Sequence, residues 1–173
     1  NPFSDCQQNV LGTLTVLDSC RVAGTPRFIL ASSNAPLGNH SPPATEDKVP
    51  RPLSPYGASK LAAEAYCSAY NGSWGLNTTI LRFSNVYGPF SSHKTSVVAK
   101  FMGDILSSGR ITIDGDGTQT RDFLYVEDLC RAVKSALETN ITGELYQIGS
   151  GLETSVRSLV NMLSQVTNLP FTL

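Results

Sequence analysis

The segment RFILAS, residues 27–32, is a short apolar run that follows Gly24 and Pro26, and it predicts a buried β-strand. On its N-terminal side, residues 5–22 carry apolar side chains at close to a helical period, which predicts a helix before the strand. The apolar positions of this helix are Val10, Leu11, Leu14, Leu17 and Val22.

On the other side of the strand, a segment rich in Pro, Asn and Ser extends to Pro55 and predicts a long loop of the kind that often carries function. Ser54 and Pro55 then provide an N-cap and a first helical residue. We expect this second helix to run to about Tyr70 and to end at Asn71-Gly72.

The remaining chain continues to alternate between strand and helix patterns. Strands are predicted at 77–88 and 144–151, extended segments around an Asp-Gly turn in 110–126, and helices at 96–108, 126–139 and 154–167, the last capped by Thr154 or Ser155. Strands separated by helices indicate an α/β protein with a mostly parallel sheet.

The composition excludes several classes of function. A net charge of −1 over 173 residues gives no electrostatic reason to expect nucleic acid or an anionic membrane as partner. No apolar run is long enough for a membrane span, and no signal peptide is visible. The cysteines are scattered, which argues against a metal site and favours reduced thiols in a cytoplasmic protein. They are Cys6, Cys20, Cys67 and Cys130.

Tyr56 and Lys60 lie one turn apart at the start of the predicted second helix, so their side chains share a face. A tyrosine with its usual pKa of about 10 is a poor base near neutrality. A nearby ammonium group lowers that pKa and makes the tyrosine a usable general acid and base. Alone, the pair is weak evidence for catalysis and is more simply explained as part of an amphipathic helix with a solvated lysine.

Polar side chains also follow the predicted strands. Ser32 and Ser33 end the strand at 27–32, where ligands bind in open parallel sheets, although they could simply satisfy backbone groups there. Asn85 ends the next strand and could donate to a phosphate or cap a turn. Arg121 could bind a phosphate through two hydrogen bonds, or it could form a surface ion pair with Asp122.

Six segments in order resemble the extended short-chain dehydrogenase/reductases, the family of NAD-dependent sugar-nucleotide epimerases and dehydratases. They are NVLGT (9–13), FILASS (28–33), SPYGASK (54–60), LRFSNVYGP (81–89), GDGTQTRDFLYVEDL (115–129) and YQIGSG (146–151). The resemblance covers essentially the whole chain and implies part of a Rossmann-type doubly wound sheet plus part of a smaller substrate domain.

The resemblance also implies roles for these residues. Tyr56 would be the catalytic acid and base, Lys60 would lower its pKa and bind the nicotinamide ribose of NAD, and Ser33 would hold the reacting hydroxyl. Ser32, Phe83 and Ser84 would lie on the cofactor side. Residues expected to contact a nucleotide sugar are Asn85, Ser96, Val97, Thr112, Asp114 and Arg121.

By the same resemblance, residues 1–88 and 122–151 would belong to the NAD-binding domain, and 89–121 and 152–173 to the substrate domain. Members of the family begin with a strand and a G-x-x-G-x-x-G turn that receives the pyrophosphate of the dinucleotide. This motif has no counterpart here, so we expect a fragment that alone binds NAD poorly and is inactive. A homodimer through helices near 5–22 and 56–70 is also expected.

The activity that the resemblance favours is epimerisation at C4 of a UDP-hexose through a transient 4-keto sugar, with hydride passed to NAD and back. Dehydratases and decarboxylases of this family usually carry a carboxylate just after the active-site hydroxyl, whereas Ser33 is followed by Asn34-Ala35-Pro36. The alternatives are another nucleotide-sugar oxidoreductase, dehydratase or decarboxylase of the same fold, for example a 4-reductase, and a non-catalytic, truncated binding module.

Overall fold

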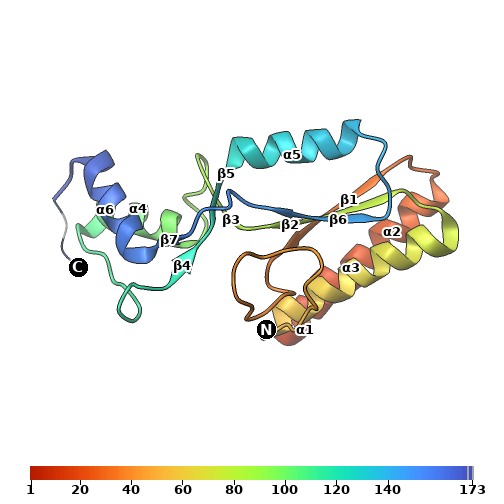
Figure 1. The fold of residues 1–173 in the computed structure, drawn as a ribbon, viewed down its shortest axis with the longest axis horizontal. Coiled ribbons are helices and arrows are strands. Elements are labelled where there is room, and N and C mark those ends of the chain that lie inside the picture. Colours follow the sequence, from red (N-terminus) through yellow and green to blue (C-terminus); the bar gives the residue numbers. More distant parts are fainter. Residues whose placement is uncertain (171, 173) are drawn as a thin grey trace. The chain divides into compact units, whose positions relative to one another are not determined.

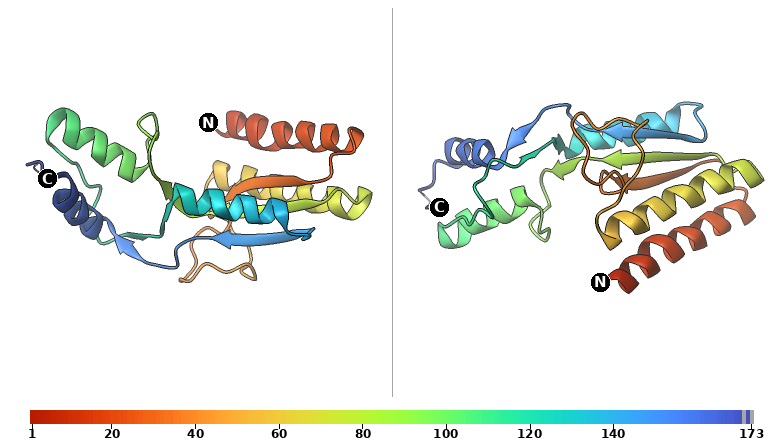
Figure 2. Two further views of the ribbon diagram at one scale, coloured as in Figure 1. Left: turned by 90° about the horizontal axis from the view of Figure 1, so that it is seen from above. Right: turned by 60° about the horizontal axis from the view of Figure 1, so that its bottom comes forward.

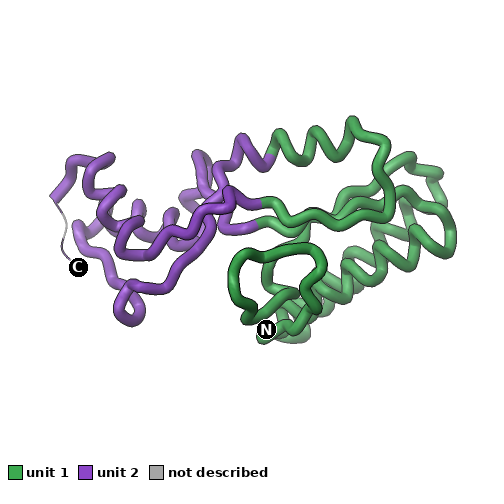
Figure 3. Tube along the Cα trace, in the orientation of Figure 1, with its two compact units in different colours: residues 1–83, 130–148 green, residues 84–129, 149–173 purple. Residues whose placement is uncertain are grey.

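The computed structural model describes residues 1–170 and 172, which form two compact units (Figure 3). Unit 1 combines Asn1–Phe83 with Cys130–Ile148. Unit 2 combines Ser84–Leu129 with the described residues from Gly149 onward. The chain therefore enters unit 2 at the end of one strand and returns to unit 1 within a helix.

A three-stranded parallel sheet forms the centre of unit 1, as predicted from the alternation of strands and helices. Its strands are β1 (Phe28–Ser33), β2 (Thr78–Phe83) and β6 (Glu144–Ile148), in the order β1-β2-β6. In β2 every residue but the last is buried, as expected for a central strand that is covered on both faces.

Helices lie on both faces of this sheet. A continuous helical stretch of α1 (Pro2–Asp5), η1 (Cys6–Leu11) and α2 (Gly12–Val22) runs beside α3 (Pro55–Trp74) along one face (Figures 1 and 2). The part of α5 (Val126–Glu138) that belongs to unit 1 lies along the other face. The β1-α3-β2 connection is thus a βαβ unit, the crossover that parallel strands require.

The second helix begins where it was predicted but ends later. Ser54 is the N-cap of α3, and its hydroxyl accepts a hydrogen bond from the Gly57 amide at 3.0 Å. The predicted end at Asn71-Gly72 is wrong, because the helix continues to Trp74 and Gly75 closes it with φ 66°. The Asn71 side chain instead donates to the Leu76 carbonyl at 2.9 Å.

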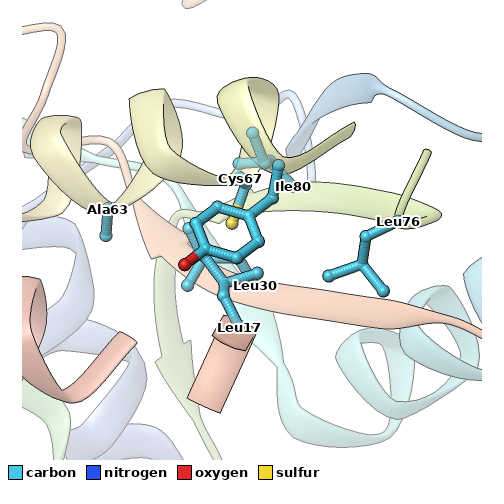
Figure 4. Close-up of a cluster of buried hydrophobic side chains, with 7 residues drawn as sticks. Leu17, Leu30, Ala63, Cys67, Leu76 and Ile80 are labelled. Atoms are coloured by element: carbon cyan, nitrogen blue, oxygen red, sulfur yellow. The ribbon is translucent and has the colours of Figure 1, made fainter. Parts of the chain in front are cut away.

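The core of unit 1 lies between α2, α3 and the sheet (Figure 4). Helix α3 contributes Ala63, Cys67 and Tyr70, which follow one another at helical spacing. The other buried members are Leu17, Leu30, Leu76 and Ile80. Burial raises the pKa of the Cys67 thiol to about 12, so this cysteine acts as a small apolar side chain.

Unit 2 contains short strand pairs and two packed helices. The strands are β3 (Asn85–Tyr87), parallel to β5 (Phe123–Tyr125), and β4 (Thr120–Arg121), antiparallel to β7 (Thr154–Ser155). Its helices are α4 (Val97–Ser108) and α6 (Val156–Thr167), besides the first turn of α5. Ser155 caps α6, which resolves the choice between Thr154 and Ser155.

Side chains of α4 and α6 form the core of unit 2 together with Ile111. Phe101 and Ile105 come from α4, and α6 contributes Val156, Leu159, Val160 and Leu163. The extended segment predicted at the start of 110–126 makes only an isolated bridge, between Arg110 and Thr172. Ile111 is buried against the helices of the unit 2 core. Side-chain packing therefore holds this segment in place of the strand-to-strand hydrogen bonds that the prediction implied.

Two kinds of feature are missing from the described residues. None of their helices is both long and apolar enough to cross a membrane. Residues 1–170 and 172 also contain no group of three or more His, Cys, Asp or Glu side chains that could hold a metal ion.

Candidate active site

The carboxyl ends of β1 and β2 lie side by side at one edge of the unit 1 sheet. Ser33 is in register with Phe83, and Phe83 is in register with Ile148 of β6. Parallel sheets of this type bind ligands at this edge. The sheet therefore brings the predicted residues Ser32, Ser33 and Phe83 together.

Ser32 and Ser33 point to opposite faces, because successive residues of a strand alternate. The Ser32 side chain is buried at 4% exposure and donates to Glu64 Oε1 at 2.5 Å. Ser33 is half-buried, and its Oγ accepts the Ala35 amide at 3.1 Å. That bond occupies a lone pair of Ser33 and leaves its hydroxyl proton available for a ligand.

Tyr56 and Lys60 share one face of the first turns of α3. The Lys60 ammonium lies 5.9 Å from the centre of the Tyr56 ring, and the tyrosine is 41% exposed. Lys60 Nζ donates to the Ala31 carbonyl at 3.0 Å, which holds the ammonium at β1, two residues before Ser33. An accessible phenol, a nearby cation and a serine hydroxyl therefore lie in the same part of unit 1.

Two opposing effects act on the pKa of Lys60. Burial lowers its pKa, while the carboxylate of Glu64, one turn further along α3, acts in the opposite direction. The net shift is downward. Lys60 is thus a partly desolvated cation, and such a cation affects a neighbouring phenol more strongly than a solvated one.

The start of α3 is fixed by close contacts with its neighbours. A side chain at Gly57 would place its Cβ 2.6 Å from the Ala35 carbonyl oxygen, so only glycine lets the helix approach the loop after β1. Ser59 Oγ donates to the Tyr56 carbonyl at 2.8 Å and accepts from Asn9 Nδ2 at 3.0 Å. Asn9 belongs to η1, a π-helical turn of the kind often found at functional sites.

Two charged residues beneath this site were missed by the sequence analysis. Glu64 and Arg82 are 4% and 2% exposed, and their closest contact is 2.6 Å, between Glu64 Oε2 and Arg82 Nη2. The signal that could have revealed them is Arg82 itself, an ionised side chain inside the apolar run TTILRF, since a buried charge needs a partner.

In unit 2, the carboxylate of Asp122 gathers several donors. It accepts from the Ser150 amide at 2.9 Å and hydroxyl at 2.8 Å, from the Gly151 amide at 2.9 Å, and from Ser84 Oγ at 3.3 Å. The Asp122 carbonyl accepts the Asn85 amide at 3.0 Å and Asn85 Nδ2 at 3.1 Å. The predicted strand 77–88 is therefore interrupted at Ser84 and resumes as β3.

The other predicted substrate residues of unit 2 are exposed or half-buried. Arg121 is exposed on β4, and its Nη1 donates to the Thr120 carbonyl at 2.7 Å. Ser96 and Val97 start α4, and Val97 packs against the unit 2 core. Thr112 lines an open hollow of about 500 Å³, and Asp114 is exposed two residues later.

The Asp122 cluster predicts an acid-sensitive stability. Burial alone would raise the pKa of Asp122, but the hydrogen bonds from Ser150, Gly151 and Ser84 outweigh it and hold the pKa below 3.8. The stabilisation is then complete above the unfolded pKa of about 3.9 and is lost as the pH falls through the lower folded value.

We therefore expect Asp122→Asn to be less stable than wild type near neutral pH, and the difference to shrink as the solution is acidified. Urea unfolding of both chains across this range measures it. Asp104→Asn is the control, because the Asp104 carboxylate forms a surface pair with Lys100 at 3.0 Å and its loss should change stability little at any pH. A difference that stays constant with pH contradicts this prediction.

Comparison with known proteins gives the site its context. The chain is 39% identical over 167 residues to a putative UDP-glucose 4-epimerase of Methanocaldococcus jannaschii, covering 94% of this chain and 54% of the relative. A human dTDP-D-glucose 4,6-dehydratase is 33% identical over 159 residues, covering 91% of this chain and 45% of the relative. The chain thus spans about half the length of the curated relatives it matches.

Solved structures of nucleotide-sugar epimerases are also similar to this chain. The UDP-glucose 4-epimerase of Thermotoga maritima with UDP-glucose superposes with a TM-score of 0.92 and 32% identity, covering 100% of this chain and 58% of that one. The UDP-glucuronic acid 4-epimerase of Bacillus cereus, in complex with UDP-glucuronic acid and NAD, gives 0.88 and 34%, with 95% and 53% covered. Residues 1–149 match the NAD dependent epimerase/dehydratase family, and this chain belongs to that family.

Proposed function

We propose that the whole protein is a UDP-sugar 4-epimerase and that Ser33, Tyr56 and Lys60 are its catalytic residues. One observation carries the proposal: an exposed Tyr56 stands beside a partly desolvated Lys60, whose ammonium is held at the end of the strand that presents Ser33. A cation beside a phenol favours the phenolate form, and a phenol in this arrangement can act as a general acid and base toward a substrate hydroxyl.

Each side chain has a separate task. Tyr56 removes the proton from the 4-hydroxyl group and returns it after the keto sugar has rotated to present its other face. Lys60 stabilises the phenolate form of Tyr56. Ser33 donates a hydrogen bond to the reacting oxygen, since the bond that its Oγ accepts from the Ala35 amide at 3.1 Å leaves its hydroxyl proton available. NAD, the cofactor of the family, would supply the acceptor and donor of the hydride at C4 when bound.

The residues of unit 1 fit one end of this cofactor. Lys60 uses one of its three N–H groups on the Ala31 carbonyl and keeps two for ribose hydroxyls. Phe83, half-buried and in register with Ser33, offers an apolar surface for the nicotinamide ring. Ser32 and Ser84 remain proposals for the cofactor side. We assign residues 1–88 and 122–151 to the cofactor domain, and 89–121 and 152–173 to the substrate domain.

Asn85 and Arg121 remain our candidates for the diphosphate of the nucleotide sugar. Arg121 is exposed, and its guanidinium has further donors beyond the bond to the Thr120 carbonyl. Asn85 Nδ2 already donates to the Asp122 carbonyl at 3.1 Å, which orients the amide and leaves its second N–H for a phosphate oxygen. Ser96, Val97, Thr112 and Asp114 are proposed for the rest of the nucleotide site.

The sequence after Ser33 favours epimerisation over dehydration. Loss of water from a 4-keto sugar requires proton transfer at two further carbons, and Asn34-Ala35-Pro36 offers no carboxylate for it. The relatives include both 4-epimerases and 4,6-dehydratases, so product analysis must decide between them.

The test is to incubate the whole protein with UDP-glucose and to separate the products. A 4-epimerase forms UDP-galactose without net change in NAD, a 4,6-dehydratase forms a 4-keto-6-deoxy sugar, and a 4-reductase consumes reduced cofactor. Formation of UDP-galactose supports the proposal. Either of the other products overturns it, and binding without any turnover favours a non-catalytic module.

We also propose a homodimer through helices near 5–22 and 56–70, and a cytoplasmic location. Apolar side chains that remain exposed on these helices support the dimer, namely Leu11 at 55%, Val16 at 49% and Tyr66 at 38%. Sedimentation velocity should give the mass of two chains, and Val16→Glu should shift it to one. A monomeric wild type at micromolar concentration contradicts the proposal.

A further inference from the structure

A single buried carboxylate joins three elements of unit 1. Glu64 of α3 accepts from Ser32 Oγ of β1 at 2.5 Å and from Arg82 of β2 at 2.9 Å through Nε. Its other oxygen accepts from Arg82 Nη2 at 2.6 Å. Ser32 and Arg82 are in register on neighbouring strands, so both reach the face that α3 covers.

This network lies directly behind the proposed catalytic residues. Glu64 is one turn beyond Lys60 and two turns beyond Tyr56 on α3, at a spacing that keeps all three near one face. Ser32, its partner on β1, directly precedes Ser33. The carboxylate therefore links the helix that carries the acid and base to the strand that carries the hydroxyl.

The pair is sensitive to the loss of either member. Both side chains are at most 4% exposed. Among the described residues Arg82 Nη1 has no hydrogen-bond partner, so Glu64 is the acceptor for the hydrogen bonds that this guanidinium donates there. Removing one member leaves an uncompensated buried charge, whereas replacing both by apolar side chains of similar volume is often neutral for stability. A buried salt bridge thus need not be kept for stability alone.

Glu64 is also the carboxylate that acts on Lys60. It raises the pKa of this lysine against the opposite effect of burial. From the packed strands, β2 contributes the charge of Arg82, and β1 contributes the uncharged Ala31 carbonyl. The remaining titratable side chains of the helices packed against α3 are Asp5, Cys6, Asp18, Cys20 and Arg21.

We propose that Glu64 is a positioning residue, which together with Arg82 fastens the helix of Tyr56 and Lys60 to the strand of Ser33 and keeps a negative charge one turn from the Lys60 ammonium. The roles given to those three residues rest on the proposed function, while the network itself is a property of unit 1. Glu64 acts through Lys60 and Ser32 and touches no substrate.

Two variants separate positioning from stability. Glu64→Gln removes the charge and leaves Arg82 without an ionised partner. Glu64→Leu/Arg82→Met removes both charges and keeps the volume of the pair. We expect the single variant to be destabilised and the double variant to recover most of the stability in urea unfolding.

The decisive readout is the NMR titration of the Lys60 side chain in this chain, which needs neither cofactor nor turnover. Lys60 should titrate at lower pH than wild type in both variants, because both lack the carboxylate. The shift should be smaller in the double variant, because that variant also loses the positive charge of Arg82. In the whole protein, both should lose about tenfold or more in kcat with KM within about threefold, since the geometry at the reacting atoms is disturbed more than binding is.

Glu138→Gln is the matched control. Glu138 stands four residues after Lys134 on α5, the same spacing as Glu64 after Lys60, but the pair is exposed and 3.7 Å apart. Glu138→Gln should leave the free energy of unfolding, the NMR titration of Lys60 and kcat unchanged. The proposal is overturned if Lys60 titrates as in wild type in either variant, or if the double variant recovers kcat together with stability.

Failure of the proposed function gives a different result. If wild-type protein forms no UDP-galactose but Lys60 shifts as expected in both variants, the epimerase assignment falls and the positioning role stands. If UDP-galactose is formed and Lys60 does not respond, the reverse holds.

Discussion

Tyr56→Phe is expected to reduce kcat of the whole protein by about 10²–10⁴-fold, the usual contribution of a general acid and base. The substitution removes one oxygen from a side chain that is 41% exposed, so it should not disturb the core of unit 1. KM should change little, because the role proposed for the phenol is proton transfer and not binding. Initial rates of UDP-galactose formation at several UDP-glucose concentrations separate the two parameters.

Tyr66→Phe provides the matched control for this prediction. Tyr66 lies on the same helix and is 38% exposed, so both variants lose a phenolic hydroxyl from similar surroundings on α3. Only Tyr56 has the Lys60 ammonium within 5.9 Å of its ring. Near-normal turnover of Tyr56→Phe, or an equal loss in Tyr66→Phe, would falsify the assignment.

The largest effect on stability is expected for Leu17→Ala, which should lower the free energy of unfolding by about 2–5 kcal/mol. Leu17 is 0% exposed and is the buried contribution of α2 to the core of unit 1 (Figure 4). Truncation leaves a cavity between the helix and the other side chains of the cluster. Since small domains are stable by only about 5–15 kcal/mol, a loss of this size is a large fraction.

Leu137→Ala is the control for Leu17. Leu137 is 54% exposed on α5, outside the helices proposed for the dimer, so its truncation should change the free energy of unfolding by no more than about 0.5 kcal/mol. Urea unfolding monitored by circular dichroism compares the two variants. Equal effects would show that α2 is not held to unit 1 by the contacts of Leu17.

The secondary structure was predicted well where one local pattern controls it. The apolar run at 27–32 became β1 at Phe28–Ser33, and Ser54-Pro55 began α3 as expected. The α/β class followed from the alternation of such patterns. Boundaries that depend on distant contacts were missed. Helix α3 continues past Gly72, and the Asn71 side chain donates to Thr142 Oγ1 at 2.8 Å, in a segment 71 residues further along the chain.

The break between β2 and β3 has the same cause. Residues 77–88 look like one strand because β-branched and apolar residues occur on both sides of Ser84 and Asn85. Ser84 donates to the Asp122 carboxylate and Asn85 donates to the Asp122 carbonyl, and the strand is interrupted at Ser84. Neither contact leaves a local signal in the sequence. The π-helical turn η1 was likewise invisible, because an apolar helical period does not distinguish it from an α-helix.

The residues of the candidate site leave a clearer signal in the sequence than the residues that support them. Tyr56, Lys60 and Ser33 stand out through residue type and order, and the sheet and α3 place them in one part of unit 1. Glu64 looks like any polar residue on an amphipathic helix until its burial is known. Only the charge of Arg82 within an apolar strand hints at such a partner.

The same Arg82 has a consequence for how the sheet assembles. Side chains alternate along a strand, so a slip of β2 by one residue would turn Arg82 away from α3 and leave two buried charges apart. An apolar residue at this position would tolerate that error, because Thr79, Ile80 and Leu81 are buried whichever face they meet. The ion pair therefore makes misregistered pairing of the central strand costly and selects the alignment in which Ser33 and Phe83 end together.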